Sequence, residues 1–373
     1  MPKSIIQKII QFVFIFILIP TIPLHANHKK QSNQPSIKTI WGTVDFNDLD
    51  PITQRFLTHS SLKRMQKIDQ SGPSPYFGVF PHFWRHDHCL GVWHLLRIFN
   101  RPLKEQLTGL YHDISHSAFS HLADHFFGKG ALYYQGNHSY QDKIHLEFLR
   151  KKCYDLLQIP EIRRTQIDYV DLDPEKYIAL DCPLPDLCAD RIEYIVHTGL
   201  ITNLITEKDV EKILECLRFQ DGRWFLTEAE PARLIGELSL HFTENLWGAP
   251  WNFILYHYFS QALKRAIELK ILDQTKFLEG NDQIILEEME RSQDPTIRQY
   301  LEKCRTPLLF VKFFTTTGSV YNLSFKVKFR GVDPYVCQNN RLIRLTEIDP
   351  AYKKNFNRVR DNCQNERRII LPD

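Results

Sequence analysis

The chain has 373 residues, with 47 Lys and Arg against 44 Asp and Glu, and 43% of its residues are hydrophobic while 24% are charged. This balance is that of a globular protein, and it excludes disordered, collagenous, coiled-coil and multi-span membrane chains. The formal net charge of +3 is too small to indicate nucleic acid as a partner.

The first 26 residues have the pattern of a secretory signal peptide. Two lysines and no acidic residue accompany an apolar run at 9–19, and a small-residue site follows near Ala26. This pattern predicts cleavage after Ala26 and export to the periplasm or the exterior, with no further membrane span. A retained N-terminal membrane anchor is the alternative, because an uncharged run of this length can just span a thin bilayer. Pro20 and Pro23 shorten the usable helix and favour cleavage.

Residues 27–37 are polar and predict a linker, whereas residues 38–305 predict a helical domain. Apolar residues in the second range recur every three or four positions, as in Leu90, Trp93 and Leu96. That spacing is typical of an amphipathic helix, and prolines between the segments mark expected helix ends. The sequence therefore predicts a mainly α protein built on a helical bundle.

The apolar period changes to that of a strand within residues 306–373. Leu323, Phe325 and Val327 alternate with polar residues, as in a half-exposed strand. The apolar stretch before them favours a β-hairpin that turns near Thr317. A smaller α+β region with a β-hairpin is therefore expected at the C-terminus.

Basic residues form the polar side of this expected strand. They are Lys326, Lys328 and Arg330. The simplest interpretation is a solvated sheet edge, which charged residues protect from pairing with other chains. Binding of an anion or of a partner is the alternative.

The chain has eight cysteines, and an exported protein could join them in disulfides. The sequence contains no pair with the spacing of a zinc or redox motif, and Cys182 and Cys188 are the only close pair. The pairing therefore stays open between buried thiols and bridges.

Histidines are unevenly placed, since six of the sixteen fall between His82 and His116. The strings at 85–88, 112–116 and 190–194 combine imidazoles with carboxylates. Such a nitrogen and oxygen donor set suits Fe, Mn, Zn, Co or Ni. A metal site of this kind can also bind water and a phosphate oxygen, which hydrolysis of a phosphoester requires.

The order of these motifs resembles the HD-domain metal-dependent phosphohydrolase superfamily, and it is most similar to the deoxynucleoside triphosphate triphosphohydrolase branch. The resemblance runs from about residue 38 to residue 200 and includes Arg85-x-x-His88 and the string at 112–121. It implies an HD-domain helical bundle and one divalent transition metal ion, with Mg accompanying a nucleotide substrate. The implied metal ligands are His88, His112, Asp113 and Asp190.

The resemblance also implies roles for residues around the metal. Arg85 and Arg191 lie where relatives contact phosphate, and Gln70 and Tyr194 lie where relatives contact the sugar. His116, His121, Asp124 and His138 lie where relatives hold catalytic or proton-relay groups.

Two departures from the family pattern concern the catalytic histidine and the substrate. Relatives have His-Glu where this chain has His138-Ser139. The acid that would orient the histidine is therefore either lacking or supplied by Asp142. Relatives also have Arg-Asp where this chain has His197-Thr198, and the aspartate there contacts the sugar 3′-hydroxyl.

The resemblance therefore predicts a phosphohydrolase that splits a (deoxy)nucleoside triphosphate into nucleoside and triphosphate. One alternative is hydrolysis of a nucleoside monophosphate, a cyclic nucleotide or another phosphoester. A second alternative is an exported interaction protein that uses the HD fold. Relatives often form oligomers, so a homo-oligomer is also compatible with the sequence.

Overall fold

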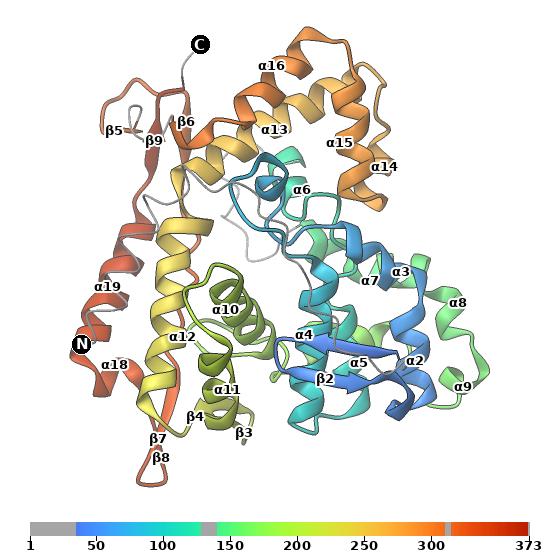
Figure 1. The fold of residues 1–373 in the computed structure, drawn as a ribbon, viewed down its shortest axis with the longest axis vertical. Helices are drawn as coiled ribbons and strands as arrows, with labels where there is room; N and C mark the ends of the chain where they lie inside the picture. Colours follow the sequence, from blue (N-terminus) through green and yellow to red (C-terminus); the bar gives the residue numbers. More distant parts are fainter. Residues whose placement is uncertain (1–34, 128–139, 310–314, 372–373) are drawn as a thin grey trace, which may run out of the picture.

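The computed structural model describes residues 35–127, 140–309 and 315–371 (Figure 1). The predicted signal peptide at 1–26, residues 27–34 of the predicted linker, and His138 lie outside these ranges. In the part of the chain that is described, no helix has both the length and the apolar character needed to cross a membrane.

The protein is mainly helical, as the sequence predicted. The α-helices of the described ranges are α2 (Pro51–Thr58), α3 (Ser60–Arg64), α4 (Arg85–Ile98), α5 (Leu103–Tyr111), α6 (Leu122–Phe127), α7 (Tyr140–Lys152), α8 (Tyr154–Leu157), α9 (Pro160–Arg163), α10 (Ala189–Ile201), α11 (Glu207–Cys216), α12 (Ala229–Phe242), α13 (Pro250–Glu268), α14 (Gln274–Glu279), α15 (Asp282–Arg291), α16 (Pro295–Cys304), α18 (Leu345–Ile348) and α19 (Pro350–Gln364). The strands are β1 (Ser36–Thr39), β2 (Gly42–Asp45), β3 (Leu217–Gln220), β4 (Arg223–Leu226), β5 (Thr315–Thr316), β6 (Leu323–Phe325), β7 (Tyr335–Gln338), β8 (Arg341–Arg344) and β9 (Arg367–Ile369).

Asp-Pro pairs start three of these helices. Asp50, Asp294 and Asp349 each accept hydrogen bonds from two backbone N–H groups of the first turn of α2, α16 and α19. Proline follows at the first helical position, where its missing N–H leaves no hydrogen bond unmade. The start of each of these helices is therefore fixed by the local sequence.

The interior consists of two apolar cores. The larger core includes Ile192 and Ile195 of α10, and the smaller core includes Leu107 and Leu110 of α5. Helix α4 contributes to both, because its apolar side chains point to either side. Figure 1 shows α10 between α12 and the α4–α5 pair. The junction of α4, α5 and α10 therefore lies where the two cores meet.

The strands form small sheets, and one of them joins the C-terminal region to the helical part. Strands β3, β4, β7 and β8 lie in that order in one sheet, with β4 parallel to β7. Strands β7 and β8 form a hairpin whose two turn residues, Asn339 and Asn340, have φ values of 50° and 60°. A two-residue hairpin turn requires such positive φ values, and Asn adopts them readily.

The C-terminal α+β region with a hairpin is thus confirmed, but the predicted position of the hairpin is wrong. Strands β5 and β6 do not pair with each other near Thr317, because β9 lies between them. The alternating segment pairs with a strand from the end of the chain, and such a distant partner leaves no local turn signal.

All eight cysteines are free thiols.

Candidate metal centre

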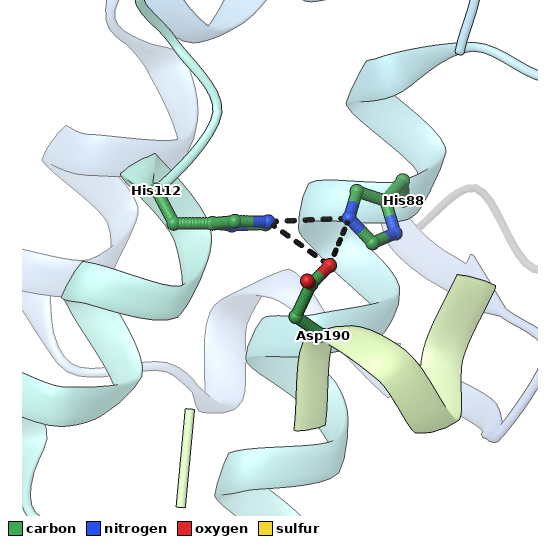
Figure 2. Close-up of side chains that lie close together, drawn as sticks. All are labelled: His88, His112 and Asp190. Carbon is green, nitrogen blue, oxygen red and sulfur yellow. Dashed lines mark hydrogen bonds and ion pairs between the residues drawn. The ribbon is translucent and has the colours of Figure 1, made fainter. Parts of the chain in front are cut away.

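Three helices bring the predicted metal ligands together. His88 lies in the first turn of α4, His112 follows the last residue of α5, and Asp190 lies in the first turn of α10. Figure 2 shows these three side chains pointing toward one another. His88 Nε2 lies 3.2 Å from His112 Nε2 and 3.0 Å from Asp190 Oδ1, and His112 Nε2 lies 3.6 Å from Asp190 Oδ1. Any pair of these ligand atoms lies within 4.8 Å.

Asp113 lies beside these three residues. Its Oδ2 atom is 3.5 Å from Nε2 of His88 and 3.5 Å from Nε2 of His112. We call the four residues His88, His112, Asp113 and Asp190 the HD cluster. Its donors are two imidazole nitrogens and carboxylate oxygens, a set that fits a divalent transition metal and leaves room for ligands from a substrate.

Hydrogen bonds on the far side of each imidazole fix its orientation. Nδ1 of His88 donates to Glu193, and Nδ1 of His112 donates to the Gly109 carbonyl over 2.8 Å. Each Nε2 atom is therefore left free to face the cluster, as metal-ligating histidines require. A role for Glu193 was not predicted from the sequence, although residues three apart on a helix, such as Asp190 and Glu193, lie on the same face.

Burial and neighbouring opposite charges shift the pKa values of the HD cluster in opposite directions. Burial lowers the pKa of His88, but the carboxylates of Glu193 and Asp190 raise it to about 10. Burial raises the pKa of Asp190, but the two histidines hold it far below its usual range. The carboxylates therefore stay ionised and favour a cation at this position, and a metal would have to replace the proton on His88.

Arg85 is placed next to the cluster with unused hydrogen-bonding capacity. It is 1% exposed, its Nη1 atom pairs with Asp113, and its Nε atom donates to Ser120 Oγ over 2.7 Å. Its Nη2 atom has no hydrogen-bond partner among the described residues. A guanidinium held in this way offers further N–H groups to a phosphate oxygen.

His116 lies on the same side as Arg85. Its Nε2 atom is 3.3 Å from Asp113 Oδ1, and its Nδ1 atom has no hydrogen-bond partner in the described ranges. Burial and the charge of Arg85 lower its pKa to about 3. His116 is therefore neutral at neutral pH and is a hydrogen-bonding group there rather than an acid.

His121 and Asp124 lie next to His116. The rings of His116 and His121 meet edge to face with centroids 5.1 Å apart, and His121 Nδ1 lies 3.5 Å from Asp124 Oδ2. Burial lowers the pKa of His121, while Asp124 opposes this effect. The predicted proton-relay pair is thus close to the cluster.

The predicted substrate-contacting residues fall into two places. Gln70 and Tyr194 line a cavity together with His121. Arg191 instead donates to the carbonyls of Cys182 and Asp186, so its guanidinium is engaged by the loop before α10. His138 lies outside the described residues.

Comparisons with known proteins agree with this description. No protein-family model matches the chain. It is 24% identical over 311 residues to the uncharacterized protein YdhJ of Bacillus subtilis, covering 82% of this chain and 90% of that protein. It is also 24% identical over 264 residues to the metal-dependent phosphohydrolase cns2 of Cordyceps militaris, covering 69% of this chain and 74% of that protein.

A solved structure shares the fold. The crystal structure of a hypothetical protein from Aquifex aeolicus matches with a TM-score of 0.59 and 15% sequence identity, covering 88% of this chain and 99% of that chain. At this identity the match shows the fold alone. The sequence similarity to a metal-dependent phosphohydrolase, together with the clustered histidines and aspartate, supports a relationship of this chain to the HD-domain phosphohydrolase superfamily.

Proposed function

We propose that this protein is a metal-dependent phosphohydrolase whose substrate is a nucleotide. The observation that carries the proposal is the HD cluster beside the buried Arg85, which has an N–H group without a partner in the described ranges. A divalent cation held by such donors supplies Lewis-acid chemistry for hydrolysis of a phosphoester or phosphoanhydride. Fe, Mn, Zn, Co and Ni all suit this donor set.

The residues around the cluster have separate tasks in this proposal. Arg85 binds an oxygen of the phosphate under attack, and its pairing with Asp113 holds the guanidinium in place. Neutral His116 accepts a hydrogen bond at Nδ1 from the substrate or from water. His121, supported by Asp124 and lining the cavity, transfers a proton to the leaving oxygen.

Two substrates are compatible with this site. The resemblance to deoxynucleoside triphosphate triphosphohydrolases favours release of triphosphate from a (deoxy)nucleoside triphosphate. One observation favours a different phosphoester, namely that His197 is bound to Glu193 over 2.7 Å while Thr198 lines the cavity. Where relatives have Arg and Asp near the sugar, this chain therefore has His197, which supports His88 through Glu193, and Thr198, which offers a hydroxyl group.

Metal analysis and a nucleotide panel test this proposal. Purified protein should contain a divalent transition metal, and incubation with nucleoside mono-, di- and triphosphates should yield a product that identifies the bond, with triphosphate separated from phosphate by chromatography. The variant His112→Ala should lose both metal and turnover, whereas His241→Ala on α12, which belongs neither to the cluster nor to the lining of the adjacent cavity, should keep both. A metal-loaded wild-type protein that hydrolyses no member of the panel would refute the proposal.

We also propose that the protein acts outside the cytoplasm, on the basis of the signal-peptide pattern at 1–26. Cleavage after Ala26 would give a mature chain that begins at Asn27. Mass spectrometry of the N-terminus of protein recovered from cells tests this proposal, and an intact Met1 in the recovered protein would contradict it.

A further inference from the structure

A cavity lies beside the HD cluster and is built from distant parts of the chain. Its lining includes Gln70 from the N-terminal part, Tyr194 from α10, and Trp247 from the segment before α13. Lys328 and Arg330 from the C-terminal region line the same cavity. From the sequence alone, both residues were expected to lie on a solvated sheet edge.

The cavity begins next to the cluster. Tyr194 follows Asp190 by four residues on α10, so the two side chains lie one helical turn apart on the same face. His121, which also lines the cavity, touches His116 at the cluster. His121 and Tyr194 thus connect the lining of the cavity to the cluster, although none of the four cluster residues lines the cavity itself.

Lys328 and Arg330 are held in place by the apolar side of their segment. Leu323, Phe325 and Val327 are buried, and the ring of Phe325 stacks on that of Phe253 in α13 with centroids 3.8 Å apart. Because burial alternates along the segment, Lys328 lies on the side opposite to these apolar residues. The direction in which the Lys328 side chain leaves the backbone is thus set by the core.

Within the described part of the chain, neither of these two cations is ion-paired with a carboxylate. Among the described residues, the contacts of these two cations are the ring of Trp247 for Arg330 and the mutual charge of the pair, with no ion pair or side-chain hydrogen bond to either. Arg330 lies 5.9 Å from the ring centroid of Trp247. The charge of Arg330 and then burial lower the pKa of Lys328 to about 8, although Asp142 and Asp124 oppose this. Because Lys328 and Arg330 repel each other and neither is ion-paired within the described ranges, a bound anion would stabilise both charges.

We propose that Lys328 and Arg330 form an anion-binding subsite, which recognises a phosphate group of the substrate other than the one attacked at the HD cluster. The inference deepens the proposed function and rests on it for the role of the cluster. It assigns the substrate to nucleotides that carry more than one phosphate. The aromatic lining, which includes Trp247, Trp251 and Tyr256, adds contact area for the base.

Calorimetric binding to the full chain tests this subsite without turnover. The probes are ATP, inorganic tripolyphosphate and adenosine, each titrated into protein kept metal-free with a chelator. ATP should bind most tightly and adenosine most weakly. In Lys328→Ala and in Arg330→Ala the Kd for ATP and for tripolyphosphate should each rise about tenfold, as expected for loss of one charged hydrogen bond.

Two further variants separate the subsite from a general effect of charge or folding. Lys326→Ala removes a neighbouring exposed cation that does not line the cavity, and its Kd should match that of the wild type. Lys328→Arg keeps the charge and should retain most of the affinity. Thermal unfolding of each variant confirms that it is folded.

The outcomes distinguish the two proposals. Unchanged Kd values for ATP in Lys328→Ala and Arg330→Ala would overturn the subsite, even if the enzyme hydrolyses nucleotides. An equal loss of affinity in Lys326→Ala would also overturn it, because the effect would then be one of net charge. If these Kd values rise as expected but the metal-loaded wild type hydrolyses no phosphoester, the subsite stands and the proposed function fails.

Discussion

Glu193 accepts a hydrogen bond from Nδ1 of His88, and both residues are fully buried. The same carboxylate accepts a second hydrogen bond from His197 over 2.7 Å. Glu193 therefore fixes which nitrogen of His88 faces Asp190 and adds negative charge behind the cluster. Its contribution to metal binding should be measurable even though it touches no substrate.

Replacing Glu193 by Gln should weaken metal binding by about 10- to 100-fold, the usual effect of losing such a supporting residue. The amide preserves the shape of the side chain but removes the charge that makes His88 a stronger ligand. Competition with a chromophoric chelator measures the change. Glu237→Gln, a half-buried position on α12, is the matched control. Equal metal affinity in wild type and Glu193→Gln would contradict this role.

Replacing Arg85 by Lys should lower kcat/KM for the nucleotide substrate by about 100-fold or more, while metal content stays near that of the wild type. Lysine keeps one charge but cannot pair with Asp113 and contact a phosphate at the same time. Steady-state kinetics and metal analysis of the same preparation check this. Full activity in Arg85→Lys would show that the unused N–H group of Arg85 does not contact the substrate.

Binding of ATP to the metal-free protein should weaken as the pH rises through about 8. The charge of Arg330 and then burial lower the pKa of Lys328 to about 8, with Arg191 acting in the same direction and Asp142 and Asp124 against it. Below this pH the ammonium form binds the anion, and above it the neutral amine does not. In Lys328→Arg the decline should disappear, because arginine stays charged. Calorimetry from pH 7 to 9 compares the two proteins, and parallel profiles would rule out Lys328 as the titrating group.

Asp282 should make folding stability fall with rising pH. The side chain is buried and accepts hydrogen bonds from the backbone N–H groups of Phe119 and Asp69. Burial raises its pKa to about 7, although these bonds oppose the shift. The folded protein therefore retains a proton that the unfolded chain releases near pH 4, so stability is fully present below that pH and is lost as the pH rises toward 7.

The variant Asp282→Asn isolates this effect. One linked proton changes the free energy of unfolding by at most about 1.4 kcal/mol per pH unit, and the variant should lack this decline between pH 4 and 7. Denaturant unfolding at several pH values measures the slopes, with Asp209→Asn at a half-buried position in the first turn of α11 as the control. Identical slopes for wild type and Asp282→Asn would mean that Asp282 is ionised throughout.

The sequence predicted those features that depend on local pattern. The helical period of α4 and the order of His88, His112, Asp113 and Asp190 are visible in the chain itself, and the structure brings these four residues together. The lining of the cavity was not predictable in this way. Lys328 follows a strand that pairs with β9, a segment far away in sequence, so its place in the cavity depends on tertiary structure.

The wrong prediction of a hairpin near Thr317 has the same cause, namely a strand partner that is distant in sequence. Alternation at Leu323, Phe325 and Val327 correctly indicated a strand with one buried face, and the strand itself spans Leu323–Phe325. Alternation does not specify the partner, however. The role of Glu193 was missed for a related reason, since only the packing of α4 against α10 brings it to His88.

Because α4 lies between the two apolar cores, a metal bound beside it would affect how strongly the two cores are held together. His112 follows a helix that belongs to the smaller core, whereas Asp190 begins a helix that belongs to the larger one. An ion bound by both residues would add a cross-link between these two parts, which also contact each other through packing and through hydrogen bonds such as that of His88 to Glu193. Metal loading should therefore make the two parts unfold in a single thermal transition. The same ligand atoms would then serve both catalysis and the stability of the fold.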